Sequence, residues 1–279
     1  MNTNAAIIGL GLIGSCWAKN LDSDGVLCAS WNRSPKADLP KFNSDLIAVV
    51  KGAQIVHVCV SDEIVVKEVV AKIVSVATPD HTVIQSTTID PNTSDLLKSS
   101  VEKKGAKYIE APFTGSLPAA QDRKTVFYLG GDSAIVDQCM PYLKRLSHKQ
   151  FHIGSNRQAC TLKLAMNLQI ASIVEALAEA LTISREAKIP DDLFFSVFKE
   201  NASYSGVAGL KEPKLKANDF SPQFSVKHMA KDMRLLAEHV GEARYASLQT
   251  IRDVLAKAER EGLADEDFSS VIQLLKAKP

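Results

Sequence analysis

The strongest constraint on the fold is a glycine-rich turn near the N-terminus. An apolar run at residues 5–9 leads into Gly9-Leu10-Gly11-Leu12-Ile13-Gly14, and residues 15–22 have helical potential. Between a strand and a helix, the first glycine allows the tight turn, the second lets a pyrophosphate approach, and the third lets the helix pack closely. The helix N-terminus then holds the phosphates. Outside this context the glycines would form a plain structural turn. The context predicts a dinucleotide-binding Rossmann fold.

Strand and helix signals alternate through the first half of the chain. Further apolar runs predict strands at residues 26–31, 54–60, 82–86, 106–110 and 125–130. Apolar residues at helical spacing predict helices at residues 45–51 and 63–76. Continuous apolar strands separated by helices indicate an α/β domain with a mostly parallel, doubly wound sheet.

The second half has a different character. Residues 159–188 contain no Gly or Pro and carry a helical apolar stripe, which predicts a helix of roughly 45 Å that Pro190 ends. Helices are also expected at residues 192–200, 228–241 and 246–262. We expect a Rossmann domain at residues 1–155 and an all-α substrate and dimerisation domain at residues 156–279, with the long helix between them.

Composition excludes several classes of protein. A chain of 279 residues that is 46% hydrophobic can build two cores, and its net charge of +1 gives no general attraction to nucleic acid or to a membrane. The five cysteines are widely spaced, so neither a disulfide framework nor a metal site is expected. The glycines interrupt the first apolar run, and no apolar stretch is expected to be long enough to span a bilayer. These features predict a cytoplasmic protein.

The end of the second strand bears on the choice of cofactor. An NAD enzyme normally has Asp or Glu there for the ribose 2′-hydroxyl, whereas this chain has Trp31-Asn32-Arg33-Ser34. A guanidinium can donate two parallel hydrogen bonds to a phosphate, so Arg33 and Ser34 favour NADP(H). The simpler alternative is a solvated arginine before Pro35.

Lys163 and Asn167 are four residues apart near the start of the long helix, so they share one face. A cleft at a domain junction would put this face beside a substrate, and a lysine there could protonate a carbonyl oxygen. By spacing alone the pair is an ordinary solvated helix face.

Several motifs in order resemble the β-hydroxyacid dehydrogenases, and within them the glyoxylate/succinic semialdehyde reductases, with 3-hydroxyisobutyrate dehydrogenase as a cousin. Besides the glycine turn and Trp-Asn-Arg-Ser, the resemblance is carried by Thr87-Thr88-Ile89-Asp90-Pro91, Ala111-Pro112-Phe113-Thr114-Gly115-Ser116, Lys163-Leu-Ala-Met-Asn167, Lys231-Asp232-Met233 and Asp265-Glu-Asp-Phe-Ser269.

The resemblance implies roles for individual residues. Lys163 would be the general acid in reduction, and Asn167 would orient the substrate. The expected substrate-binding residues are Thr114, Gly115, Ser116 and Thr87. Beyond residues 9–14 and 32–34, the expected cofactor-binding residues are Val60, Ser61, Thr88 and Lys231. Two simpler alternatives remain: Lys231 could be a surface lysine paired with an acid, and the Thr-Thr-Asp-Pro segment could end a strand and cap a helix.

The chain also departs from the family pattern. Asn156-Arg157-Gln158-Ala159 replaces a Gly-x-Gly, Thr87 and Thr114 replace serines, and Arg123-Lys124 replaces a glycine-containing turn. These changes leave the substrate open. Two rivals to a semialdehyde-type reductase are an imine reductase, which generally lacks the lysine, and a non-catalytic NADP-binding sensor or interaction protein. The resemblance also implies a homodimer or homotetramer.

Overall fold

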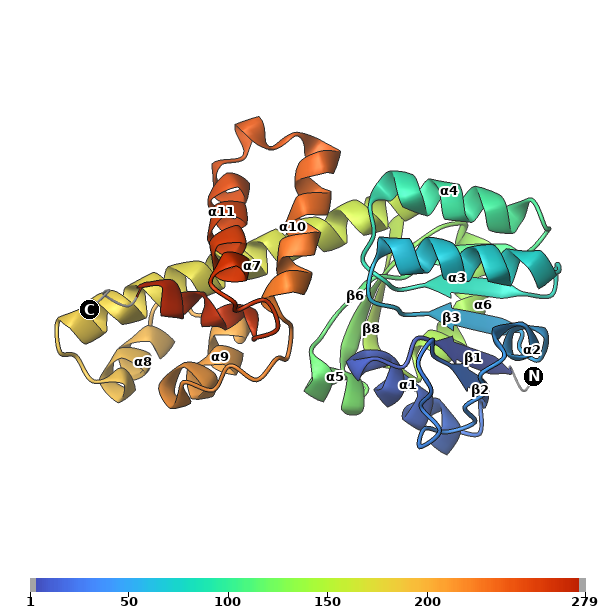
Figure 1. The fold of residues 1–279 in the computed structure, drawn as a ribbon, viewed down its shortest axis with the longest axis horizontal. Coiled ribbons are helices and arrows are strands. Elements are labelled where there is room, and N and C mark those ends of the chain that lie inside the picture. Colours follow the sequence, from blue (N-terminus) through green and yellow to red (C-terminus); the bar gives the residue numbers. More distant parts are fainter. Residues whose placement is uncertain (1–3, 276–279) are drawn as a thin grey trace. The chain divides into compact units, whose positions relative to one another are not determined.

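The structure, a computed structural model, describes residues 4–275. Its internal contacts divide the chain into two compact units, Met1–Lys163 and Leu164–Pro279. The division falls inside the long helix α7 (Asn156–Glu186), which was predicted over residues 159–188. Figure 1 shows the strands in the first unit and a wholly helical second unit.

The described part of the first unit contains an eight-stranded sheet in the order β2-β1-β3-β4-β5-β7-β6, with β8 paired to β7. Strands β1 to β5 are parallel, β7 is antiparallel to β5 and β6, and β8 is parallel to β7. This arrangement confirms the predicted Rossmann class. The strands are β1 (Ala5–Ile8), β2 (Leu27–Trp31), β3 (Ile55–Val58), β4 (Thr82–Gln85), β5 (Lys107–Glu110), β6 (Phe113–Thr114), β7 (Thr125–Gly130) and β8 (Ser147–Gly154).

Helices cover both faces of this sheet because alternate strand residues point to opposite sides. Ile7 and Ile84 lie in a core with α1, α5 and α6, whereas Ile8 and Val83 lie in a core with α2, α3 and α4. Figure 1 shows α3 and α4 lying along the same face. The helices are α1 (Leu12–Ser23), α2 (Leu46–Lys51), α3 (Glu63–Val76), α4 (Pro91–Glu102), α5 (Leu117–Gln121) and α6 (Ser133–Leu143).

The second unit packs its helices around a single apolar core that includes Leu177 of α7, Met233 of α10 and Leu255 of α11. Its described residues contain no strand, which agrees with the predicted all-α class. Besides α7, the elements are α8 (Asp191–Lys199), α9 (Gly206–Ala217), α10 (Val226–Val240), the short 3-10 helix η1 (Glu242–Arg244), α11 (Ala246–Arg260) and the 3-10 helix η2 (Phe268–Leu275).

Helix α7 corrects one expectation from the sequence. Its 31 residues are long and apolar enough to cross a membrane by length and composition alone, so the statement that no stretch reaches that length was wrong. A core helix meets the same two criteria, and 44% of its most apolar window is buried within the protein. Leu164, Leu177 and Leu181 contribute to the core of the second unit.

Candidate functional site

The glycine turn joins β1 to α1 as predicted. Gly9 has a φ of +102°, and a Cβ on it would lie 2.1 Å from the carbonyl oxygen of Cys59. A Cβ on Gly14 would lie 1.9 Å from the carbonyl oxygen of Gly9, so both positions require glycine. Around Gly11, by contrast, a Cβ would meet no heavy atom within 4 Å, so its backbone faces open space that a ligand can enter.

The turn lies where the order of the strands reverses. Strand β1 has β2 on one side and β3 on the other, and all three are parallel. In open parallel sheets, ligands bind outside the carboxyl ends of the strands at such a switch point. The turn that contains Leu10, Leu12 and Ile13 follows β1, and Val60 and Ser61 follow β3. Two predicted cofactor segments therefore lie at neighbouring strand ends.

The residues around α1 fit the phosphates of a dinucleotide. Gly11 is the N-cap of α1 and offers no side chain to the first N–H groups of the helix, which leaves them for an anion. Asn32 instead shapes the turn, since its Oδ1 accepts the backbone N–H of Leu10 at 3.0 Å. Arg33 and Ser34 are exposed after the end of β2.

The loops after β3 and β4 are tied together. The Thr87 hydroxyl oxygen accepts the backbone N–H of Val60 at 2.9 Å, and Thr87 is buried, so this residue links two loops. Thr88 is half-buried beside it. Asp90 caps α4 by accepting the N–H groups of Asn92 and Thr93. The simpler reading of the Thr-Thr-Asp-Pro segment thus holds for Asp90, and the binding roles of Thr87 and Thr88 stay predictions.

The predicted substrate residues form one short turn between β6 and α5. Gly115 has a φ of +129°, and a Cβ there would lie 3.1 Å from both Ala119 Cβ and Thr125 Cγ2. Ser116 is the N-cap of α5, and its side chain makes no capping hydrogen bond. The Thr114 side chain hydrogen-bonds to Tyr128. Hydroxyl and backbone N–H groups of consecutive residues are thus gathered in one place.

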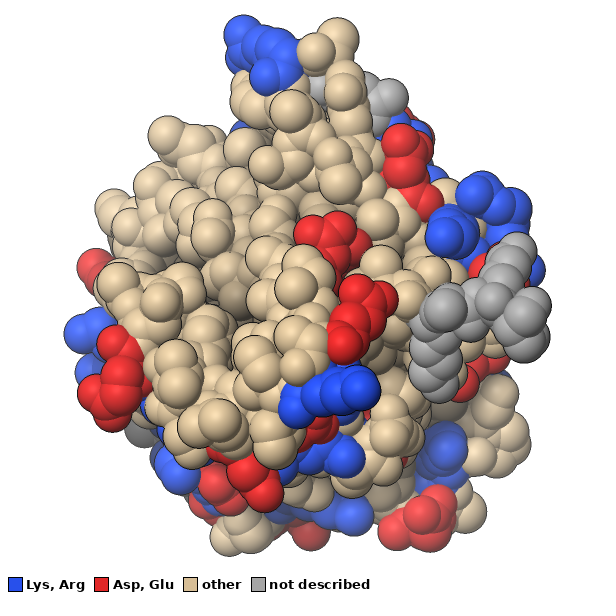
Figure 2. Space-filling view, turned by 90° about the vertical axis from the view of Figure 1, so that its left-hand side faces the viewer, with Lys and Arg blue, Asp and Glu red and all other residues tan. Residues whose placement is uncertain are grey.

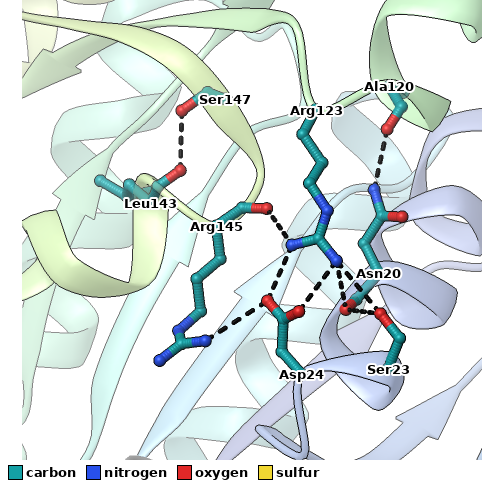
Figure 3. A network of polar contacts seen from close by, with 8 residues as sticks. All are labelled: Asn20, Ser23, Asp24, Ala120, Arg123, Leu143, Arg145 and Ser147. Atoms are coloured by element: carbon teal, nitrogen blue, oxygen red, sulfur yellow. Dashed lines mark hydrogen bonds and ion pairs between the residues drawn. The ribbon is translucent and has the colours of Figure 1, made fainter.

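A network around Arg123, which the sequence did not predict, fixes this segment to the end of α1 (Figure 3). The guanidinium binds both carboxylate oxygens of Asp24, at 2.7 and 2.9 Å, and lowers the pKa of that carboxyl. It also donates to the carbonyl oxygens of Asn20 at 3.1 Å and Arg145 at 2.9 Å. Arg123 has a φ of +58° where relatives were expected to have a glycine turn, so these contacts hold a strained backbone.

Glu110, the last residue of β5, is a fully buried acid that sequence reasoning missed. Its Oε2 accepts hydrogen bonds from Ser94 Oγ at 2.5 Å and Tyr108 Oη at 2.7 Å, and its Oε1 accepts one from Gln85 Nε2 at 2.7 Å. Cys160 of α7 also hydrogen-bonds to it. Burial raises the pKa of the Glu110 carboxyl to about 8. The available signal was an acid at the end of an apolar strand.

Lys163 and Asn167 lie on α7 one turn apart, with only 8% and 2% of their surfaces exposed. The alternative of a solvated helix face is therefore excluded. Asn167 Nδ2 donates to Asp232 Oδ2 of α10 at 2.6 Å, so a buried carboxylate orients the amide. Asp232 was included in the Lys-Asp-Met motif of the sequence, but its hydrogen bond to Asn167 was not predicted.

Lys231 of α10 is half-buried, and its Nζ lies 3.0 Å from Asp232 Oδ1. Lys231 is therefore paired with a nearby acid, as the simpler alternative had it. Its contact with a cofactor stays a prediction.

His57 is a satisfied core residue, as expected, because its ring nitrogens contact Tyr142 Oη at 2.8 Å and Ser86 Oγ at 2.7 Å. Burial lowers the pKa of His57 to about 3, so the ring is neutral.

Two family models match consecutive parts of the chain. The NAD binding domain of 6-phosphogluconate dehydrogenase matches residues 4–154, which is more than half of the chain. The NAD-binding domain of NADP-dependent 3-hydroxyisobutyrate dehydrogenase matches residues 158–275.

Curated relatives match over nearly the whole chain. Glyoxylate/succinic semialdehyde reductase 1 of Arabidopsis thaliana is 26% identical over 96% of this chain and 97% of its own length. Reductase 2 of the same plant, which is chloroplastic, is 27% identical over 97% of this chain and 78% of its own length. The cytokine-like nuclear factor N-PAC of Drosophila melanogaster is 26% identical over 95% of this chain but only 46% of its own length.

Solved structures share the fold. The 3-hydroxyisobutyrate dehydrogenase of Mycobacterium tuberculosis, solved with L-serine, has a TM-score of 0.89 and 25% identity over 99% of this chain and 100% of that chain. An imine reductase from Pseudomonas sp. has a TM-score of 0.65 at 19% identity over 99% of this chain and 100% of that chain, and this likeness shows the fold alone. The family resemblance is confirmed: the chain belongs to the 3-hydroxyisobutyrate dehydrogenase-related β-hydroxyacid dehydrogenases, which are NAD(P)-dependent oxidoreductases acting on hydroxyl and carbonyl groups.

Proposed function

We propose that this protein uses NADPH to reduce a small aldehyde or keto acid to the hydroxy acid, with Lys163 as the general acid. The observation that carries the proposal is a buried lysine on α7, followed one turn later by a buried amide that Asp232 orients. The names of the Arabidopsis relatives support a short carbonyl compound that carries a carboxylate. L-serine, present with the Mycobacterium protein, is itself a 3-hydroxy carboxylate.

The proposed step needs a proton at the carbonyl oxygen while hydride reaches the carbonyl carbon. Lys163 supplies this proton from its ammonium group and takes it back in the oxidation direction, so a free alkoxide never forms. Positioned general acids contribute about 10²–10⁴-fold to rate. Asn167 orients the substrate and supports the lysine, since its amide is fixed by a 2.6 Å hydrogen bond to Asp232.

The carboxylate of the substrate would bind to the turn that contains Thr114, Gly115 and Ser116. Hydroxyl and backbone N–H groups are suitable donors for a carboxylate, and hydrogen bonds to a charged group contribute about 1.5–3 kcal/mol each. The left-handed backbone at Gly115 supports this role because it turns neighbouring polar groups within one tight bend.

We assign NADP(H) as the cofactor. When bound, it supplies the hydride, and the protein supplies position and charge. The glycine turn and the N-terminus of α1 would hold the pyrophosphate, and Arg33 and Ser34 the 2′-phosphate. The exposure of both residues after β2, where an acid would serve NAD, supports this assignment.

A homodimer or homotetramer is the proposed assembly. Figure 2 shows broad areas without Lys, Arg, Asp or Glu on the side of the molecule where α8 lies in Figure 1. Exposed apolar side chains on α7, α8 and α9 support an interface: Ile183, Leu193, Val197 and Leu210. Light scattering on the purified protein would give the number of subunits, and a monomer at micromolar concentration would refute the assembly.

The test is NADPH consumption with glyoxylate, succinic semialdehyde and tartronate semialdehyde, with a cyclic imine and NADH as controls. We expect turnover of at least one carboxylated carbonyl compound and a clear preference for NADPH. Turnover of the imine alone would favour an imine reductase. Tight NADPH binding without turnover would favour the non-catalytic role.

A further inference from the structure

Glu110 connects to the loops at the carboxyl edge of the sheet through Gln85. Gln85 Nε2 donates both to Glu110 Oε1 at 2.7 Å and to the carbonyl oxygen of Thr87 at 2.8 Å, and its Oε1 accepts the backbone N–H of Thr87 at 2.5 Å. The Thr87 hydroxyl then accepts the N–H of Val60. One buried carboxyl group is therefore linked to the loop after β4 and to the loop after β3.

A second set of contacts leads from the same carboxyl group to α7. Ser94 Oγ donates to Glu110 Oε2 and accepts a hydrogen bond from Asn156 Nδ2 at 3.1 Å. Asn156 is the first residue of α7, and Cys160, one turn further, hydrogen-bonds to Glu110 directly. Lys163 follows three residues after Cys160 on the same helix.

Stability alone is a weak reason for this arrangement. Gln85, Ser94 and Glu110 are all buried with at most 1% of their surfaces exposed, and burying polar groups costs free energy that apolar packing would not. Fully satisfied buried networks do fix one arrangement of the segments that they join. Here those segments are the two loops and the start of α7.

We propose that Glu110 is a positioning residue that sets the start of α7, and with it Lys163, relative to the loops after β3 and β4. The inference rests on the proposed function, in which Lys163 gives the proton, and on the prediction that Val60, Ser61 and Thr88 in those loops bind the cofactor. Misplacement of a reacting group by about 1 Å can cost about 10²-fold in rate. Glu110 is fully buried and acts through the segments that it joins.

Three isosteric or small substitutions test the proposal. Glu110→Gln puts an amide NH2 group, which cannot accept, in place of one carboxyl oxygen. Ser94→Ala removes the hydroxyl that joins Glu110 to Asn156, while the Cys160 contact remains. Tyr108 belongs to β5 itself, so Tyr108→Phe removes one hydrogen bond from the same carboxyl but no hydrogen bond to α7 or to the two loops. The readouts are kcat, the substrate KM, the NADPH dissociation constant and amide hydrogen exchange. We expect kcat to fall about 10- to 100-fold in Glu110→Gln and in Ser94→Ala, with KM and NADPH affinity within about threefold. Tyr108→Phe should keep kcat within about threefold.

Exchange should quicken at residues 156–163 in both variants, and at residues 60–62 and 87–90 in Glu110→Gln, without a general increase. Equal losses of kcat in all three variants, or uniformly faster exchange, would overturn the proposal and leave Glu110 a scaffold residue. Should the native protein reduce no carbonyl compound, the proposed function fails, and exchange at these segments still decides whether Glu110 links them. If Glu110→Gln does not fold, the proposal is tested by comparing kcat of Ser94→Ala, which should fall, with kcat of Tyr108→Phe, which should not.

Discussion

Arg33 is the residue on which the cofactor assignment depends most. It is exposed directly after β2, where the proposal has its guanidinium bind the 2′-phosphate, and Lys36 supplies a second exposed cation in the same loop. A planar guanidinium binds phosphate through two parallel hydrogen bonds, whereas an ammonium acts as a point charge. Substitution of Arg33 and of Lys36 therefore distinguishes specific binding of the 2′-phosphate from a general effect of positive charge.

Replacement of Arg33 by alanine should weaken NADPH binding about 10- to 100-fold, the range for lost charge-assisted hydrogen bonds. NADH has no 2′-phosphate, so its affinity should stay within about threefold. Fluorescence titration of both cofactors gives these constants, and Lys36→Ala is the control. Equal losses for NADPH and NADH, or an equal effect of Lys36→Ala, would contradict the assignment of Arg33.

Glu110 also makes a prediction about pH. Its pKa is raised by burial from an ordinary 4.5 to about 8, while burial likewise raises the pKa values of neighbouring Tyr108 and Cys160 and keeps them neutral. Between pH 4.5 and about 8, the Glu110 carboxyl of the folded protein holds a proton that it has lost in the unfolded chain. The Glu110 contribution to the free energy of unfolding must therefore fall as pH rises from 4.5 towards 8.

Urea unfolding of the native protein and of Glu110→Gln at pH 5, 6.5 and 8 measures this contribution. The variant cannot titrate, so its stability relative to the native protein should improve steadily with pH. Curves that stay parallel across the three values would show that Glu110 does not carry the proton.

At the scale of elements, α5 is held by contacts at its C-terminal end. Asn20 Nδ2 of α1 donates to the carbonyl oxygen of Ala120 at 2.9 Å, and Arg123 binds Asp24 just beyond α1. The turn with Gly115 precedes α5 directly, so these contacts fix the proposed substrate segment against the helix of the glycine turn. The left-handed backbone of Arg123 is a cost that its guanidinium contacts offset.

Two substitutions separate the strain from the contacts. Arg123→Ala loses the guanidinium but keeps a Cβ in the left-handed region, whereas Arg123→Gly loses the guanidinium and the strain together. Alanine should be about 1 kcal/mol less stable than glycine to urea, since the left-handed conformation penalises a Cβ by about that amount. A glycine variant less stable than the alanine variant would contradict this account of the turn.

The elements that sequence reasoning predicted are those with strong apolar patterns. Strands β1 to β5 and β7 and helix α3 follow buried runs, and the long apolar stripe gave α7 within three residues at its start and two at its end. Strand β8 was missed because it pairs with β7 alone, and most of its side chains are exposed or partly exposed. Helices α6 and α9 were not predicted, and each contains a proline, Pro141 and Pro213, which weakens a helical pattern. The short β6 and α5 gave no pattern that was used, and for α4 only its N-terminal cap at Asp90 was anticipated.

At the scale of the whole molecule, ordered motifs carried the family assignment, and the comparisons confirm it. The glycine turn and the pair of Lys163 and Asn167 were found because each has a fixed local spacing. Partners brought together by the fold were not found: Asp232 for Asn167, Gln85 and Ser94 for Glu110, and Asp24 for Arg123. Such contacts join residues far apart in the sequence, and no local pattern encodes them.

The central claim is that Lys163 is the proton donor in an NADPH-dependent reduction. The most direct measurement is the kcat/KM of Lys163→Ala against the native protein with the best substrate of the carbonyl panel, alongside NADPH affinity for both. We expect kcat/KM to fall by about 10²–10⁴-fold, the usual contribution of a positioned general acid, while the NADPH dissociation constant stays within about threefold. A variant that keeps its activity would contradict the role of Lys163, and so would a loss of activity that merely follows a loss of cofactor binding.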